Sequence, residues 1–170
     1  MSTTARRNVG FTLIEITVAL AILSVMMLGA IPMYRAEQLR AKEKELRLSL
    51  MQIRQALDDY KRAGDEGRIL KPVGTSGYPP SLDVLVKGAL KVGAQKPEWV
   101  YFLRHLPKDP FAEAELISSP SPSTATPASR TWDTRAYSSP PDTPAPGADV
   151  FDVFSKSKKI GLNGVPYNKW

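Results

Sequence analysis

Apolar residues follow two different patterns in the first part of the chain. The segment from Phe11 to Met33 is an almost unbroken apolar run in which Glu15 is the only charged residue. At about 1.5 Å per residue, a helix of this length can cross the hydrocarbon core of a bilayer. The run therefore predicts a transmembrane helix over residues 11–33.

The segment that follows is amphipathic. Its apolar residues recur at the spacing of one helical face: Leu39, Leu46, Leu50, Ile53, Leu57 and Tyr60. Gly64 and Gly67 end this stripe before it is long enough for a sustained heptad repeat. We therefore expect one helix from Phe11 to about Ala63, whose second half, in residues 34–64, packs on the chain's own head. On the opposite face, Glu43 and Arg47 predict a solvated i,i+4 ion pair.

Pro32 lies inside this helical pattern. A proline there removes one backbone hydrogen bond and clashes with a preceding carbonyl, so a bend is expected, with Gly29 nearby. The alternative is that the helix ends at Met33.

Beyond Gly67, short elements separated by Gly and Pro predict a globular head over residues 65–170. Ser81 is the expected N-cap of a short helix. Residues 131–137 and 149–155 are rich in β-favouring side chains and predict two strands.

Ser, Pro, Thr and Ala make up the whole of residues 118–129, a composition that predicts a surface loop. A long helix packed on a small antiparallel sheet is the simplest arrangement of these elements. The sequence therefore predicts an α+β fold.

Composition limits the chemistry of the chain. It has 23 Lys and Arg against 17 Asp and Glu, a net charge of +6, no cysteine and one histidine. Disulfides and thiolate zinc sites are excluded, and neither a Gly-rich phosphate loop nor a nucleophile elbow is present. We expect a protein that is not an enzyme.

The start of the chain combines a polar leader with a charged residue inside the apolar run. A cleavage signal lies between Gly10 and Phe11, so processing would remove residues 1–10 and keep the hydrophobic helix. Glu15 costs about 2.5–3.5 kcal/mol inside a membrane and therefore needs a partner. The amine of Phe11 in a neighbouring copy would supply one; the alternative is that Glu15 lies at the membrane interface of an ordinary anchor.

The segment Gly10-Phe11-Thr12-Leu13-Ile14-Glu15, followed by an apolar helix with Pro32, resembles the prepilin N-terminus of type IV pilins and type II secretion pseudopilins. The resemblance implies cleavage after Gly10 by a prepilin peptidase and N-methylation of Phe11. It also implies assembly into a homopolymeric filament, with Phe11 and Glu15 as assembly residues.

The head carries a second resemblance. The segment from Leu103 to Phe111, with Leu106-Pro107-Lys108-Asp109-Pro110 at its centre, is similar to an element of the major pseudopilin, the G subunit of type II secretion systems. The C-terminal segments around Trp132 and from Asp152 to Trp170 resemble a subgroup of the same proteins.

This resemblance implies a structural subunit of the periplasmic filament that drives protein export. Its partners would be an inner-membrane assembly platform, an assembly ATPase and minor pseudopilins. Two alternatives remain: a major or minor type IV pilus subunit acting in adhesion, motility or DNA uptake, and a monomeric membrane-anchored binding module.

The charges next to the apolar run do not agree with this topology. Arg6 and Arg7 precede it, whereas more basic residues follow it, so a count of Lys and Arg alone would place the head in the cytoplasm. The resemblance implies the opposite orientation, a single-pass protein of the bacterial inner membrane with its head in the periplasm.

Many relatives bind calcium in the C-terminal loop, but this chain is poor in the necessary ligands. Calcium needs six to eight oxygens, usually from several carboxylates. Asp152 is the only acid in residues 151–170, with Asn163 as a further oxygen donor, and lysines fill the loop. We expect no cofactor, and a loop held by Tyr167 and Trp170 against the sheet. The lysines favour a solvated surface over nucleic-acid binding.

Overall fold

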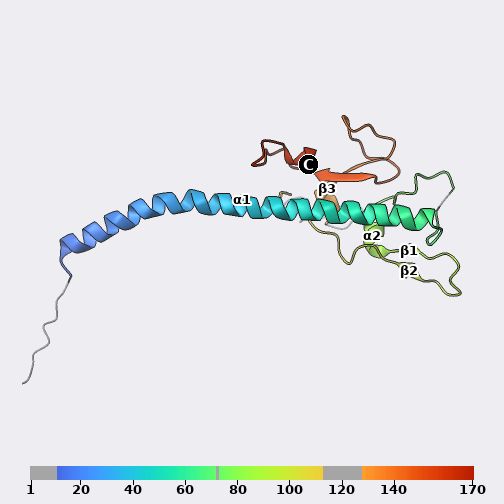
Figure 1. The fold of residues 1–170 in the computed structure, drawn as a ribbon, viewed down its shortest axis with the longest axis horizontal. Helices are drawn as coiled ribbons and strands as arrows, with labels where there is room; N and C mark the ends of the chain where they lie inside the picture. Colours follow the sequence, from blue (N-terminus) through green and yellow to red (C-terminus); the bar gives the residue numbers. More distant parts are fainter. Residues whose placement is uncertain (1–10, 72, 113–127) are drawn as a thin grey trace, which may run out of the picture. The chain divides into compact units, whose positions relative to one another are not determined.

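The computed structural model describes residues 11–71, 73–112 and 128–170, without the side chains of residues 28–32. The chain forms two compact units, Met1–Arg40 and Ala41–Trp170. The elements are α1 (Leu13–Asp65), α2 (Asp83–Lys87), β1 (Ala89–Leu90), β2 (Trp99–Val100), β3 (Trp132–Arg135) and β4 (Asp152–Ser155), with 3₁₀ turns at Ser129–Thr131 and Tyr167–Lys169 (Figure 1). The predicted α+β class with a long N-terminal helix is confirmed.

The helix α1 continues beyond the apolar run. Its backbone is helical from Leu13 to Asp65, so the alternative of a helix that ends at Met33 is wrong. The bend at Pro32 stays a prediction. In the part of the chain that the structure describes, no helical segment combines the length and hydropathy needed to cross a membrane.

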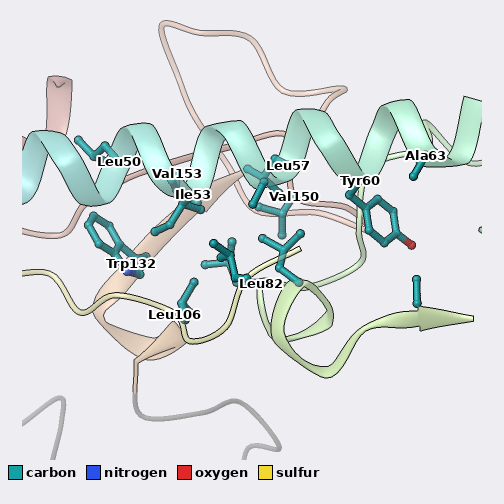
Figure 2. Packing of buried hydrophobic residues seen from close by; sticks show 14 of the residues in the cluster. Leu50, Ile53, Leu57, Tyr60, Ala63, Leu82, Leu106, Trp132, Val150 and Val153 are labelled. Carbon is teal, nitrogen blue, oxygen red and sulfur yellow. The ribbon is translucent and has the colours of Figure 1, made fainter. Parts of the chain in front are cut away.

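The second unit is built around the predicted apolar stripe of α1. Leu46, Leu50, Ile53 and Leu57 are at most 2% exposed, and Tyr60 is 9% exposed. All of them belong to one core cluster with residues from the rest of the unit, including Leu82, Leu106, Trp132, Val150 and Val153. Figure 2 shows Ile53 and Leu57 on the side of α1 that faces these residues. Each fully buried Leu or Ile contributes about 1.5–3 kcal/mol, so this face holds the head on the helix.

The two predicted strands pair as expected, but each is shorter than the predicted ranges 131–137 and 149–155. β3 and β4 are antiparallel, with Trp132 opposite Ser155 and Arg135 opposite Asp152. The head nevertheless differs from the prediction, because the described residues contain two separate two-stranded sheets.

The second sheet was not predicted. β1 pairs with β2, with Leu90 opposite Trp99. A third segment joins β1, because the Leu70 amide donates to the Leu90 carbonyl at 3.1 Å and the Val92 amide donates to the Arg68 carbonyl at 2.9 Å. Two-residue strands are too short to produce a readable alternation of apolar and polar positions.

Two predicted boundaries are wrong. Leu82, not Ser81, is the N-cap of α2, and no side chain caps this helix. Ser81 contributes its carbonyl, which accepts from the Val84 amide at 3.2 Å. The predicted loop over 118–129 falls mostly outside the described residues, but Ser129 already belongs to a 3₁₀ turn.

Candidate assembly site and the C-terminal lock

The N-terminal end of α1 is fixed by a side-chain cap that the sequence reasoning missed. The Glu15 amide donates to the hydroxyl of Thr12 at 3.3 Å, and the Ile16 amide donates to the Thr12 carbonyl at 3.2 Å. Thr12 with Glu15 three positions later has the spacing of a capping box, in which such an N-cap satisfies a free backbone donor. The T-x-x-E pattern before an apolar run was the signal that could have revealed it.

The predicted assembly residues lie at this end of the helix. Phe11 precedes Thr12, the N-cap of α1, and is 80% exposed, and the side chain of Glu15 is also exposed. Gly10 lies outside the described residues. Cleavage, methylation and the pairing of Glu15 with a neighbouring amine stay predictions.

The first unit exposes apolar side chains all around its helix. Between Phe11 and Met27 the exposed fractions of the large apolar side chains run from 51% at Ile16 to 84% at Leu13. A helix that is hydrophobic all round is normally buried in protein or lipid. This surface therefore needs a covering that a single copy does not supply within the first unit.

The C-terminal segment of the head is locked to α1 through Glu43. Its carboxylate accepts from the Leu162 amide at 2.7 Å and from the Tyr167 hydroxyl at 3.0 Å. Glu43 is only 7% exposed. The prediction of a solvated pair between Glu43 and Arg47 is therefore wrong, because the C-terminal segment covers this side of α1.

Arg47 and the C-terminal aromatics form one stack. The Arg47 guanidinium lies over the ring of Trp170, 4.5 Å from its centroid. The Tyr167 ring packs edge-on against the Trp170 ring, with 5.1 Å between the ring centroids. It also stacks on the Phe111 ring, with 4.0 Å between the centroids. Tyr167 and Trp170 thus hold the segment as expected, and their partners include Arg47 of α1 and Phe111 in addition to the sheet.

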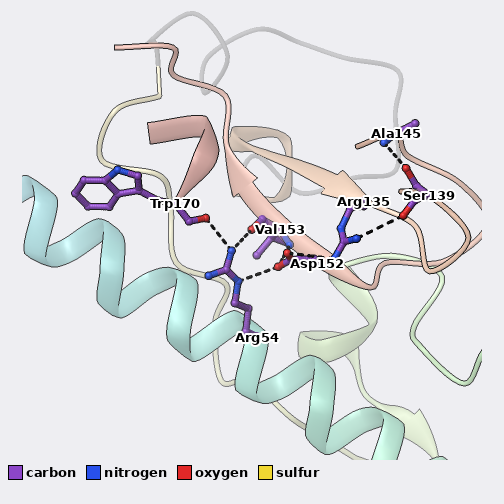
Figure 3. A network of polar contacts seen from close by, with 7 residues as sticks. All are labelled: Arg54, Arg135, Ser139, Ala145, Asp152, Val153 and Trp170. Atoms are coloured by element: carbon purple, nitrogen blue, oxygen red, sulfur yellow. Dashed lines mark hydrogen bonds and ion pairs between the residues drawn. The ribbon is translucent and has the colours of Figure 1, made fainter. Parts of the chain in front are cut away.

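The carboxylate of Asp152 forms ion pairs with two arginines. The Arg54 Nε donates to its Oδ1 at 2.8 Å, and Arg135 lies 3.8 Å from its Oδ2 (Figure 3). Arg54 also donates to the carbonyls of Val153 and Trp170, at 3.1 Å and 2.9 Å. One helix side chain therefore joins β4 to the end of the chain.

The other predicted calcium candidate is engaged locally. The Asn163 Oδ1 accepts from the Val165 amide at 3.0 Å, within its own turn. Over the described ranges, no group of three or more His, Asp and Glu is placed to hold a metal ion.

The element around Asp109 is a structural clasp. Asp109 is 3% exposed, and its carboxylate accepts from the Ser155 hydroxyl at 2.5 Å and from the Phe111 amide at 2.8 Å. The Asp109 amide donates to the Thr131 hydroxyl at 3.1 Å. This segment, which the resemblance singled out, thus holds the start of β3 and the end of β4, which lie at the same end of their sheet.

Comparison with known proteins identifies the N-terminal end of the chain. Residues 6–31 match the prokaryotic N-terminal methylation motif. No curated protein and no solved structure gives a significant match. The matched range contains Gly10, Phe11 and Glu15. The motif supports the resemblance of this chain to type IV pilin-like proteins.

Proposed function

We propose that this chain is a pseudopilin that polymerises into the periplasmic filament of a type II secretion system. The observation that carries the proposal is the largely apolar, exposed helix surface of residues 11–27, which lies within the matched methylation motif. A membrane would bury such a surface first, and the equivalent helices of other copies would bury it in the filament.

In this proposal the subunit is processed, anchored in the membrane and then assembled. A prepilin peptidase cleaves after Gly10, and the new amine of Phe11 is methylated. The single-pass helix holds the subunit in the inner membrane with its head in the periplasm. The assembly platform and its ATPase then move subunits, together with minor pseudopilins, into the filament.

Glu15 sets the register of the helices in this proposal. Its carboxylate is exposed in the single copy, and an unpaired charge in an apolar bundle is expensive. Pairing with the Phe11 amine of a neighbour removes that cost only at one relative position of the two helices.

The alternative function is a subunit of a type IV pilus, which shares every N-terminal argument. The Asp109 element favours the secretion filament, since it resembles the G subunit and here it organises the core of the head. The absence of cysteine agrees with this preference, because many type IV pilins close their heads with a disulfide.

A strain that lacks this protein, compared with the same strain after complementation, tests the proposal. Secreted protein in the medium and sheared surface fibres are scored in parallel. Loss of secretion with intact fibres is the expected result. Loss of fibres with intact secretion would move the protein to the type IV pilus.

Two point variants test the role of Glu15. Glu15→Gln keeps the size of the side chain and the backbone amide that Thr12 caps, so we expect normal membrane association without filaments. Thr12→Ala is the matched control: it weakens the start of α1 by about 1 kcal/mol but keeps the carboxylate. Filaments of normal yield from Glu15→Gln would contradict the pairing.

A further inference from the structure

An open groove runs along the C-terminal half of α1. It has a volume of about 530 Å³, and residues such as Arg47, Met51 and Asp58 of the helix face Val165, Lys169 and Trp170 of the C-terminal segment. Volumes of about 300–1,000 Å³ are typical of binding pockets. The head core is complete without these outer side chains, so the groove is available to a partner.

The groove combines an aromatic wall with positive charge. The Trp170 ring is half-buried and carries the Arg47 guanidinium on its face. Lys169 adds an exposed cation, and Met51 is 63% exposed. Aromatic-lined grooves are the usual receptors for proline-rich segments, and the cations favour a segment with an acid.

The same head presents a segment of this chemistry. Residues 140–148 are exposed throughout and include Pro140, Pro141, Asp142, Pro144 and Pro146. Residues 136–148 contain no lysine or arginine. Each proline holds φ near −65° and offers no amide hydrogen, so the loop presents apolar rings around one carboxylate.

The loop is held in place from within. The Ser139 hydroxyl donates to the Thr143 carbonyl at 3.2 Å. It also accepts from the Ala145 amide at 2.9 Å (Figure 3). The Ala136 amide donates to the Ala145 carbonyl at 3.0 Å. Because the loop is already ordered, little conformational entropy is lost when a partner binds it.

We propose that the groove of one copy receives the proline-rich loop, residues 139–147, of a second copy. Asp142 of the second copy faces Lys169 and Arg47, and proline rings pack on Trp170 and Met51. Groove and loop are different surfaces of the same chain, so the contact is heterologous and each bound copy offers a new free groove. The inference rests on the proposed polymerisation and names the head contact that propagates it.

The cysteine-free chain allows a clean crosslinking test. The double variant Asp142→Cys with Lys169→Cys, expressed as the full chain in the complemented strain, is oxidised in the filaments that sediment from disrupted cells. We expect a ladder of disulfide-linked multimers on non-reducing gels. When the two single variants are coexpressed, only dimers are expected, because each chain then carries one cysteine.

The matched control pairs Asp142→Cys with Lys96→Cys, an exposed residue outside the groove. Sedimentable filaments that give no ladder, or an equal ladder from the control pair, would overturn the head contact and leave the proposed function standing. An internal disulfide in monomers, mapped by peptide mass, would also overturn it, because the loop would then reach its own groove. If the wild-type chain gives no sedimentable filaments, the proposed function fails together with the inference.

Discussion

The Glu43 carboxylate accepts a hydrogen bond from the Tyr167 hydroxyl, 124 positions away in the chain, at 3.0 Å. The same carboxylate accepts from the Leu162 amide. Without it, the Tyr167 hydroxyl would be left unpaired in a buried place and the Leu162 amide in a partly buried one. This one side chain of α1 therefore orders the end of the head and, with it, one wall of the groove.

We expect Glu43→Ala to destabilise the head by about 2–4 kcal/mol, since each buried unpaired donor costs about 1–3 kcal/mol. Urea unfolding of the full chain in detergent, followed by tryptophan fluorescence, measures the loss. Glu45→Ala, an exposed acid on the same helix, is the control and should change stability by less than about 0.5 kcal/mol. Equal effects of the two substitutions would contradict the lock.

The lock also predicts a pH dependence in the alkaline range. Burial, followed by the hydrogen bond to the Glu43 carboxylate and its charge, raises the pKa of Tyr167 from 10.0 to about 12. In the unfolded chain this proton leaves near pH 10, so between pH 10 and 12 the folded state binds more protons. The free energy of unfolding should therefore fall as pH rises through this window, and the contribution is fully present below pH 10.

Ultraviolet titration of tyrosinate checks this assignment. One of the six tyrosines should ionise well after the exposed ones, and Tyr167→Phe should remove that late step. Burial also raises the pKa of Tyr60 and Tyr78, so Tyr78→Phe is the comparison. A late step that persists in Tyr167→Phe would be inconsistent with the lock.

The buried Asp109 should stabilise the head through the hydrogen bonds that its two carboxylate oxygens accept. Asp109→Ala leaves the Ser155 hydroxyl and the Phe111 amide without their partner, so a loss of about 2–4 kcal/mol is expected. Asp109→Asn keeps one oxygen acceptor and should cost less. Thermal unfolding measures both losses. Asp133 is an exposed acid on β3, so Asp133→Ala should hardly change the stability. Identical behaviour of Asp109→Ala and Asp133→Ala would rule out the clasp.

We expect calcium to leave the stability of the head unchanged. Both carboxylate oxygens of Asp152 already face guanidinium groups, and the oxygen of Asn163 accepts from its own turn. A ligand that binds only the folded state would raise the melting temperature. Thermal unfolding with saturating calcium and with a chelator is the measurement, and a rise that Asp152→Asn abolishes would show a calcium site.

The sequence by itself determined the features that depend on local pattern. The 3.6-residue spacing from Leu39 to Tyr60 predicted which face of α1 is buried, because one helix face must meet the head, although Leu39 itself is only partly buried. The β-favouring runs predicted β3 and β4, and the Gly10-to-Glu15 motif predicted the match over residues 6–31.

Only the tertiary structure decided what covers the polar side chains. The sequence predicted a solvated ion pair between Glu43 and Arg47. Nothing in the adjacent sequence shows that residues 162–170 pack against this turn of α1. The clasp at Asp109 and the arginine contacts of Asp152 likewise join positions far apart in the chain. Apolar periodicity is local and therefore readable, whereas the partner of a buried charge is chosen by packing between distant segments.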